Sequence, residues 1–100
     1  MDVIIIPAYE PDEQLIKLVE KLQQSDFTIV VVDDGSGENY TGIFNAIKDK
    51  THIVTLPKNC GKGAALKAGM QYIKESLPEC QNFITCDADG QHRPEDVCRV

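Results

Sequence analysis

The chain has 100 residues, a hydrophobic content of 42% and a formal net charge of −6, so it suits one globular domain over residues 1–100 with one hydrophobic core. Its acidity argues against a nucleic-acid partner and against a basic membrane-binding face. Because it opens without the basic segment of a signal peptide and has no apolar run near the ~20 residues of a membrane span, we expect a cytoplasmic protein.

Four short apolar runs are predicted to be strands, and helical patterns separate them. The runs are VIII at 3–6, IVVV at 29–32, IVTL at 53–56 and FITC at 83–86. They are rich in β-branched residues and do not alternate with polar ones, which is typical of strands that are buried on both faces.

The first predicted helix follows Pro11 and Asp12. Acidic residues in its first turn suit the helix dipole, and apolar residues recur at helical spacing as far as Leu22. A weaker helix is expected over 38–49 and a third over 62–76. The residues expected to face inward are Tyr40, Ile43, Phe44 and Ile47 in the second helix and Leu66, Met70 and Ile73 in the third.

This alternation predicts an α/β fold of the Rossmann-like type, with three layers (α/β/α) and a mostly parallel sheet joined by right-handed crossovers. A fourth helix is expected to start at Pro94, a residue that suits a first turn. Ligands of such sheets bind beyond the carboxyl ends of the strands. The loops after the four runs (PAYEP, DDGSG, PKNCGKG and DADGQH) should therefore open on one rim. That rim is expected to be acidic and to need a cation, since it collects Glu10, Asp33, Asp34, Asp87 and Asp89, with Lys62 as the nearest base.

The last of these loops is the candidate metal site. Asp87 and Asp89 stand one residue apart where the fourth run ends, so both carboxylates could aim at one hard cation such as Mg²⁺ or Mn²⁺, and Gln91 could add an amide oxygen. The alternative is a strand-end turn formed by Asp89 and Gly90. The position at the rim, opposite a second acidic loop, favours the metal site. His92 is expected to be solvated or near a helix start rather than to be a ligand.

The other loops allow both structural and binding roles. Asp34 or Ser36 could cap the following helix, or a carboxylate there could accept a hydrogen bond from a base or a ribose. Lys62, at a helix start, could pair with phosphate or be solvated, and Tyr9 could stack on a base or merely cover the rim. The segment NCGKGAALKAG is not a P-loop, and Leu66 replaces the third glycine of the dinucleotide-binding pattern.

Together the segments VIIIPAYEP, IVVVDDGS, NCGKGAALKAG and DADGQHRPED resemble family 2 glycosyltransferases with the GT-A fold, in order and in spacing. The chain is most similar to the polyprenyl- or dolichyl-phosphate sugar synthase-like branch. The resemblance implies a UDP- or GDP-sugar donor, Mg²⁺ or Mn²⁺, a lipid-phosphate or glycan acceptor, and transfer with inversion at the anomeric carbon.

The resemblance also implies roles for single residues. The nucleotide-binding residues would be Pro7, Ala8, Tyr9, Glu10, Asp33, Asp34, Lys62 and Asp87. Asp87 and Asp89 would be the DxD pair, with Asp89 the more direct metal ligand, and Gln91 matches a third ligand of the lipid-phosphate synthase branch.

One departure from the family concerns its second half, which carries the acceptor pocket and the catalytic base. No residue of this chain matches that base, so the catalytic residue is unknown. We expect a truncated, nucleotide-binding part of a GT-A domain that binds its donor without turnover when isolated. Exposed edges would favour self-association, and the full-length protein would act at the cytoplasmic face of a membrane.

Other classes are less compatible with the order of the motifs. Phosphohydrolases of the haloacid dehalogenase type place their DxD loop after the first strand and follow it with Thr or Val, whereas here it follows the fourth run and Gln91 stands there. Receiver-like phosphoacceptor modules need acidic residues after the first and third strands, where Pro7 and Pro57 stand. A dinucleotide-binding oxidoreductase would rest on the imperfect glycine loop alone. The cysteines at 60, 80, 86 and 98 form no CxxC pair, so free thiols are expected rather than a zinc site.

Overall fold

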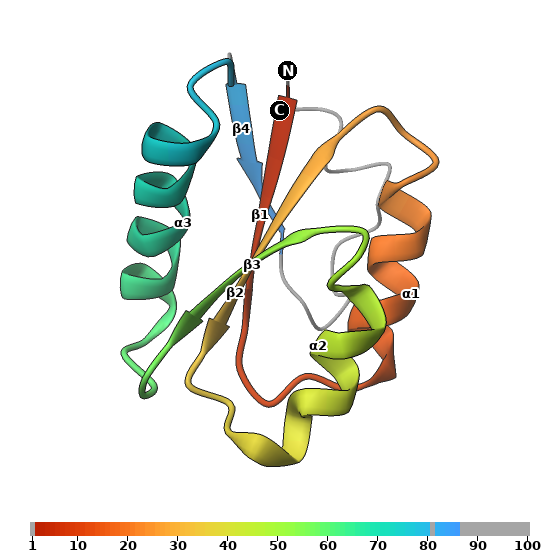
Figure 1. Cartoon of the computed structure of the whole chain (residues 1–100), viewed down its shortest axis with the longest axis vertical. Helices are drawn as coiled ribbons and strands as arrows, with labels where there is room; N and C mark the ends of the chain where they lie inside the picture. The colour runs from red at the N-terminus through yellow and green to blue at the C-terminus, as the bar shows by residue number, and fades with distance from the viewer. Residues whose placement is uncertain (1, 81, 87–100) are drawn as a thin grey trace.

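The computed structural model describes residues 2–80 and 82–86, which form one parallel sheet with helices on both faces (Figure 1). The strand order is β3-β2-β1-β4, and the three neighbouring pairs are all parallel. This confirms the predicted Rossmann-like α/β fold. The elements in chain order are β1 (Asp2–Ala8), α1 (Glu13–Leu22), β2 (Thr28–Asp34), the 3₁₀ helix η1 (Glu38–Tyr40), α2 (Thr41–Ile47), β3 (His52–Leu56), α3 (Lys62–Ser76) and β4 (Asn82–Thr85).

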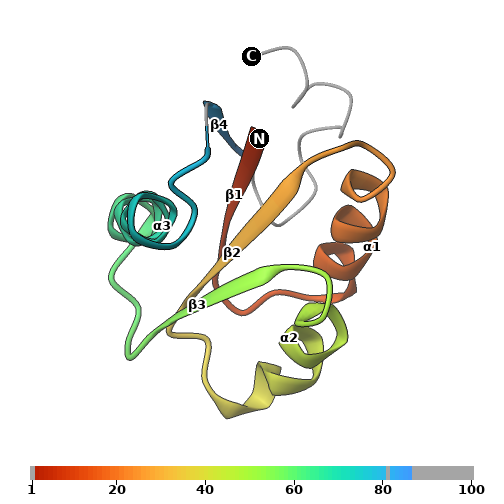
Figure 2. The ribbon, with the colours of Figure 1, turned by 45° about the horizontal axis from the view of Figure 1, so that its top comes forward.

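The two central strands divide the hydrophobic core into two layers. Helix α3 covers one face of the sheet, and α1 and α2 cover the other (Figure 2). In β1, Ile4 and Ile6 pack in the layer of α1 and α2, whereas Val3 and Ile5 pack in the layer of α3. Successive side chains point to opposite faces, so a strand with apolar residues at every position is stable only when both faces are covered.

The prediction that every strand is buried on both faces is wrong for β3 and β4. Residues of β3 are mostly half-buried and those of β4 mostly exposed. Phe83 in β4 leaves 45% of its surface accessible. Both strands lie at the ends of the strand order and each pairs with only one described neighbour. An apolar run alone does not distinguish a central strand from an edge strand.

The first three predicted helices are present, with two corrections. The structure replaces the single helix expected over 38–49 by η1 and α2, of which Phe44 and Ile47 are buried while Tyr40 and Ile43 are half-buried. Helix α3 begins and ends as predicted, but its buried stripe consists of Ala65, Gly69 and Ile73, whereas Leu66 is half-buried and Met70 is 38% exposed.

The small residues of that stripe explain the second correction. A Cβ atom at Gly69 would lie 2.7 Å from Cγ2 of Ile5. The backbone of α3 therefore lies close to β1, and large side chains are turned to its flanks. The fourth predicted helix, from Pro94, lies outside the described residues. In residues 2–80 and 82–86, no helix is long and apolar enough to cross a membrane.

Candidate functional site

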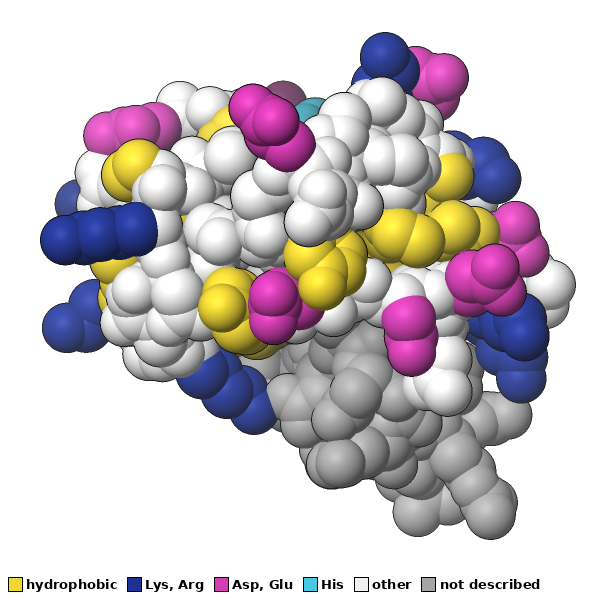
Figure 3. Space-filling model, turned by 90° about the horizontal axis from the view of Figure 1, so that it is seen from below, with side chains coloured by type: hydrophobic (Ala, Val, Ile, Leu, Met, Phe, Trp, Pro, Cys, Tyr) yellow, Lys and Arg dark blue, Asp and Glu magenta, His cyan; other side chains and the backbone are white. Residues whose placement is uncertain are grey.

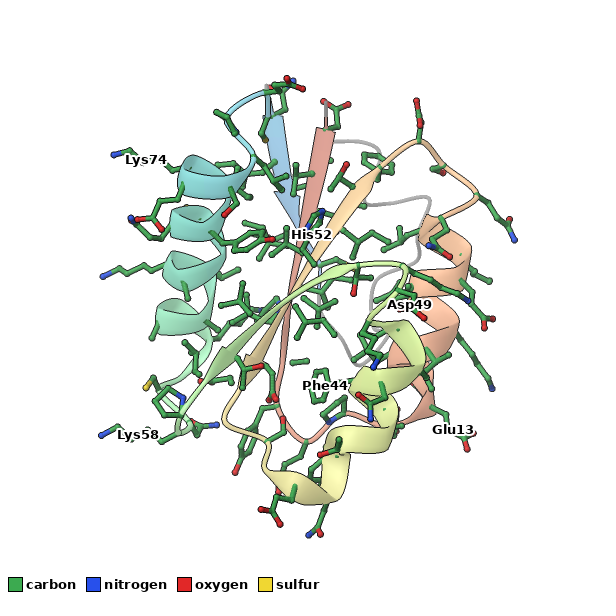
Figure 4. All side chains as sticks on the ribbon, viewed as in Figure 1. Glu13, Phe44, Asp49, His52, Lys58 and Lys74 are labelled. Atoms are coloured by element: carbon green, nitrogen blue, oxygen red, sulfur yellow. The ribbon has the colours of Figure 1, made fainter. Side chains whose placement is uncertain are left out.

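The loops after β1, β2 and β3 meet at the carboxyl rim of the sheet, as the sequence predicted. The strand arrows point toward this rim at the bottom of Figure 1, where Lys58 lies (Figure 4). Figure 3 looks onto the rim from below and shows acidic side chains beside exposed hydrophobic ones. The fourth loop, with Asp87, Asp89, Gln91 and His92, lies outside the described residues.

Asp34, the last residue of β2, joins the β2 loop to the loop before α3. Its Oδ1 accepts a hydrogen bond from the backbone N–H of Cys60 at 2.8 Å, and its Oδ2 accepts one from Gly61 at 3.0 Å. The Asp34 side chain is buried, with 3% of its surface exposed. Asp34 therefore does not cap the following helix, and η1 begins after Gly37 without any side-chain cap.

Asp33 and Ser36 join the β2 loop to the β1 loop. Asp33 Oδ1 accepts a hydrogen bond from the backbone N–H of Ser36, and Ser36 Oγ accepts one from the backbone N–H of Glu10, both at 2.9 Å. Glu10 has a φ of 48°, the left-handed conformation that non-glycine residues rarely adopt. The bond to Ser36 stabilises the bend after β1 that brings Glu10 to the rim. Ser36 therefore connects the β1 and β2 loops and does not cap a helix.

Gly35 brings two of the loops into direct backbone contact. Its φ is 71°, and a Cβ atom on it would overlap the backbone of Lys58 and Asn59. Only glycine fits such an approach in this conformation. Hydrogen bonds and backbone contact thus connect the loops after β1, β2 and β3 into a single unit.

The predicted nucleotide-binding residues of these loops are close in space but differ in exposure. Tyr9 is 52% exposed and Glu10 is exposed, so both can meet a ligand. Ala8 is 2% exposed and its side chain belongs to the core. Pro7 is half-buried beside it, and Lys62 is the first residue of α3. Their contacts with a nucleotide stay predictions.

Tyr40 is a rim residue that the sequence analysis placed only as a helix residue facing inward. Partial desolvation, the charge of the Glu10 carboxylate and a hydrogen bond to it raise the pKa of the Tyr40 phenol, and Tyr9 contributes to the same effect. The phenol therefore stays protonated to a higher pH than an isolated tyrosine. The short helix η1 places the Tyr40 phenol beside the Glu10 carboxylate of the β1 loop. No local sequence pattern predicts this contact.

Glu10→Gln is expected to lower the pKa of Tyr40 toward its ordinary value, because the substitution removes the negative charge that opposes ionisation of the phenol. An NMR pH titration of chain labelled at the tyrosine Cζ would measure this, with Glu13→Gln as the control because Glu13 is an exposed acid on α1 (Figure 4). An unchanged Tyr40 pKa in Glu10→Gln would contradict this account.

A cavity of about 470 Å³ lies beside the rim, between α2 and β3. Asp33 and Gly35 border it on the β2 side, and Thr41 and Asn45 of α2 and Lys48 just after it supply polar groups. The remaining lining residues are Gly37, Phe44, Ile53, Thr55, Leu56 and Pro57. Phe44 points from α2 toward the sheet (Figure 4). Of the predicted site residues within 2–80 and 82–86, only Asp33 lines this cavity.

The described residues alone do not form a metal centre. Residues 2–80 and 82–86 contain no group of at least three His, Cys, Asp or Glu side chains that could hold a metal ion. The predicted ligands Asp87, Asp89 and Gln91 are not among these residues. Cys60 is exposed, Cys80 is half-buried and Cys86 is buried, and Cys60 and Cys80 are free thiols.

The sequence is similar to known proteins over nearly its whole length. Residues 3–100 match the family described as Glycosyl transferase family 2. The uncharacterized protein MJ0544 of Methanocaldococcus jannaschii is 31% identical over 98% of this chain and 44% of its own length. The undecaprenyl-phosphate 4-deoxy-4-formamido-L-arabinose transferase of Yersinia pestis (strain Pestoides F) is 34% identical over 97% of this chain and 31% of its own length. The chain thus spans less than half the length of these relatives.

Solved structures show the same fold. The crystal structure of S. aureus TarS 1-349 superposes on 88% of this chain and 27% of its own with a TM-score of 0.65, at 22% sequence identity. At that identity the likeness concerns the fold alone.

Proposed function

Because the chain belongs to glycosyltransferase family 2, we propose that it holds a nucleoside-diphosphate sugar at the carboxyl rim of its sheet, as the donor for transfer to a lipid-phosphate acceptor. One observation carries the proposal. The loops after β1, β2 and β3, which contain the predicted donor residues, are interlocked at one rim by side chain-to-backbone hydrogen bonds. Parallel α/β sheets bind their ligands at this edge.

The exposed side chains at the rim suit the two ends of such a donor. The ring of Tyr9 can stack on a base, and the carboxylate of Glu10 can accept hydrogen bonds from a base or a ribose. Lys62 begins α3, where a positive side chain and the helix dipole both favour phosphate. We propose UDP or GDP as the nucleotide.

The transfer itself would be a displacement at the anomeric carbon of the sugar. The bond from that carbon to the diphosphate oxygen breaks, its electron pair leaves with the nucleoside diphosphate, and an oxygen of the acceptor forms the new bond with inversion. We propose Asp87, Asp89 and Gln91 as ligands of Mg²⁺ or Mn²⁺, which would offset the charge of the leaving diphosphate. No residue of this chain is assigned as the base that activates the acceptor.

The acceptor class rests on the relatives. The name of the Yersinia pestis relative contains undecaprenyl phosphate, a lipid phosphate. The proposed acceptor is therefore a lipid phosphate rather than a glycan, and the proposed place of action is the cytoplasmic face of a membrane. Donor binding without turnover by the isolated chain is the second candidate, because the chain spans only 31% and 44% of two relatives. Self-association stays a prediction, favoured by the 45% exposure of Phe83 on the edge strand β4.

Isothermal calorimetry with UDP, GDP and their sugars, with and without Mn²⁺, tests the donor site. We expect one of the two nucleotides to bind in the presence of Mn²⁺, and we expect Asp89→Ala to weaken this binding by about tenfold or more, since it removes a charged ligand. Asp49→Ala is the matched control, because Asp49 is exposed and lies away from the rim (Figure 4). A folded chain that binds neither nucleotide with Mn²⁺ would disprove the proposed donor site.

A further inference from the structure

Both oxygens of the Asp34 carboxylate are engaged by backbone amides of a distant loop. The donors are the N–H groups of Cys60 and Gly61, which lie 26 and 27 residues further along the chain. Hydrogen bonds to an ionised carboxylate are stronger than those between neutral groups, and both bonds are shielded because the Asp34 side chain is 3% exposed. The arrangement is a built contact between loops rather than a chance approach of surface groups.

The engaged amides stand directly before α3. Gly61 is the residue before the first turn of α3, its φ is 94°, and no side chain of this segment caps the helix. The first turn of α3 contains no acidic residue either. Asp34 thus places a negative charge from β2 beside the start of α3, where the helix dipole favours it, while the two amides that it accepts from belong to the residues just before the helix.

We propose that Asp34 is a positioning residue, which fixes the loop before α3 and thereby places Lys62 against the diphosphate of the donor. The inference rests on the proposed function and assigns Asp34 a different task from direct contact with the nucleoside. Lys62 follows Gly61 immediately, so the backbone bond to Gly61 sets the point from which the Lys62 side chain leaves.

The same geometry limits how the phosphates can be held. The amides of Cys60 and Gly61 already donate to Asp34, so they are not available to a phosphate oxygen. A negative carboxylate beside them also disfavours an anion at those amides. The diphosphate would therefore be bound by the Lys62 side chain and a cation, and Asp34 would act on it only through the position of Lys62.

Asp34→Asn separates the two tasks. The amide keeps one acceptor oxygen but presents an NH₂ group to the second backbone N–H, so one bond is lost with little change of shape. The variant is titrated with inorganic pyrophosphate, UDP and GDP in the presence of Mn²⁺. If Asp34 works through Lys62, binding of pyrophosphate and of the preferred nucleotide weakens by a similar factor, about tenfold.

A double-mutant cycle with Lys62→Ala gives the second readout. The combined loss in Asp34→Asn/Lys62→Ala should be clearly smaller than the product of the single losses, because both changes remove the same interaction. Hydrogen exchange of the Cys60 and Gly61 amides should be faster in Asp34→Asn. Asp12→Asn is the matched control, because Asp12 also accepts a backbone N–H at a helix start, that of Gln14, but lies outside the rim network.

Each contrary result has a distinct meaning. A loss of nucleotide binding with unchanged pyrophosphate binding, or losses that multiply in the double variant, would overturn the positioning role and indicate that Asp34 contacts the nucleoside. Unprotected Cys60 and Gly61 amides in a wild-type chain that binds nucleotide would overturn it as well. A folded wild-type chain that binds no nucleotide would instead overturn the proposed function. If Asp34→Asn does not fold, unchanged pyrophosphate binding by Lys62→Ala alone would refute the inference.

Discussion

Gly35→Ala is expected to lower the free energy of unfolding by about 3 kcal/mol, through left-handed backbone strain together with overlap in a packed contact. The Gly35 backbone has a φ of 71°, and the new Cβ would meet the Cα of Lys58 at 2.6 Å and overlap two further backbone atoms of Lys58 and Asn59. A backbone obstacle cannot rotate away as a side chain can. The loops after β2 and β3 would have to separate.

Gly37→Ala provides the control for this result. Gly37 also has a positive φ, 91°, but a Cβ on it would meet no atom within 4 Å. This variant should show only the conformational penalty, about 1 kcal/mol. Urea unfolding followed by circular dichroism measures both. Equal losses in the two variants would show that the loops do not touch at Gly35, and nucleotide binding should fail in Gly35→Ala alone.

Gly69→Val is expected to destabilise the chain by about 3 kcal/mol, at the upper end of the usual effect of overpacking a core. A Cβ at this position would lie 2.7 Å from Cγ2 of Ile5 and 3.2 Å from Cγ2 of Val32. The two γ-carbons of valine would extend the overlap, so α3 would have to move away from β1 and β2 and leave the layer around Ala65 and Ile73 poorly packed.

Gly63→Val is the matched substitution on the same helix. A Cβ at Gly63 would meet no atom within 4 Å, so this variant should be neutral or slightly stabilised, since valine has a better helix propensity than glycine. Thermal and urea unfolding of the pair report the difference. If Gly69→Val were as stable as Gly63→Val, the close approach of α3 to the sheet would be wrong.

The sequence predicted the fold well because its signals are local. The β-branched runs gave all four strands, and the pattern from Lys62 to Ser76 gave both ends of α3. The wrong burial of β4 and the wrong inward face of α3 have the same cause. Both depend on which other elements pack against the segment, and the sequence of one segment does not contain that information. The exposure of Phe83 depends on what borders β4, and the inward face of α3 depends on how close Gly69 lets the helix come to β1.

The sequence predicted which loops form the site, but it did not predict the hydrogen bonds between them. Topology alone brings Glu10, Asp33, Asp34 and Lys62 to one edge. The bonds from Asp34 to Cys60 and Gly61 depend on the backbone contact at Gly35, and the raised pKa of Tyr40 depends on the return of η1 toward Glu10. To predict either feature one must know how far apart the loops lie in space, and periodicity and motif spacing do not give that distance.

The long sequence separation of the rim bonds also bears on the order of folding. The bonds to Asp34 span 26 and 27 residues, and the bond from Glu10 to Ser36 spans 26. Closing loops of this length costs entropy before any contact compensates it, and parallel pairing is slow for the same reason. Since the rim bonds join loops that pairing of β2 with β1 and β3 brings together, we expect them to form late in folding. For the same reason we expect the rim bonds to open in the native protein at a lower free energy than the pairing of the central strands β1 and β2.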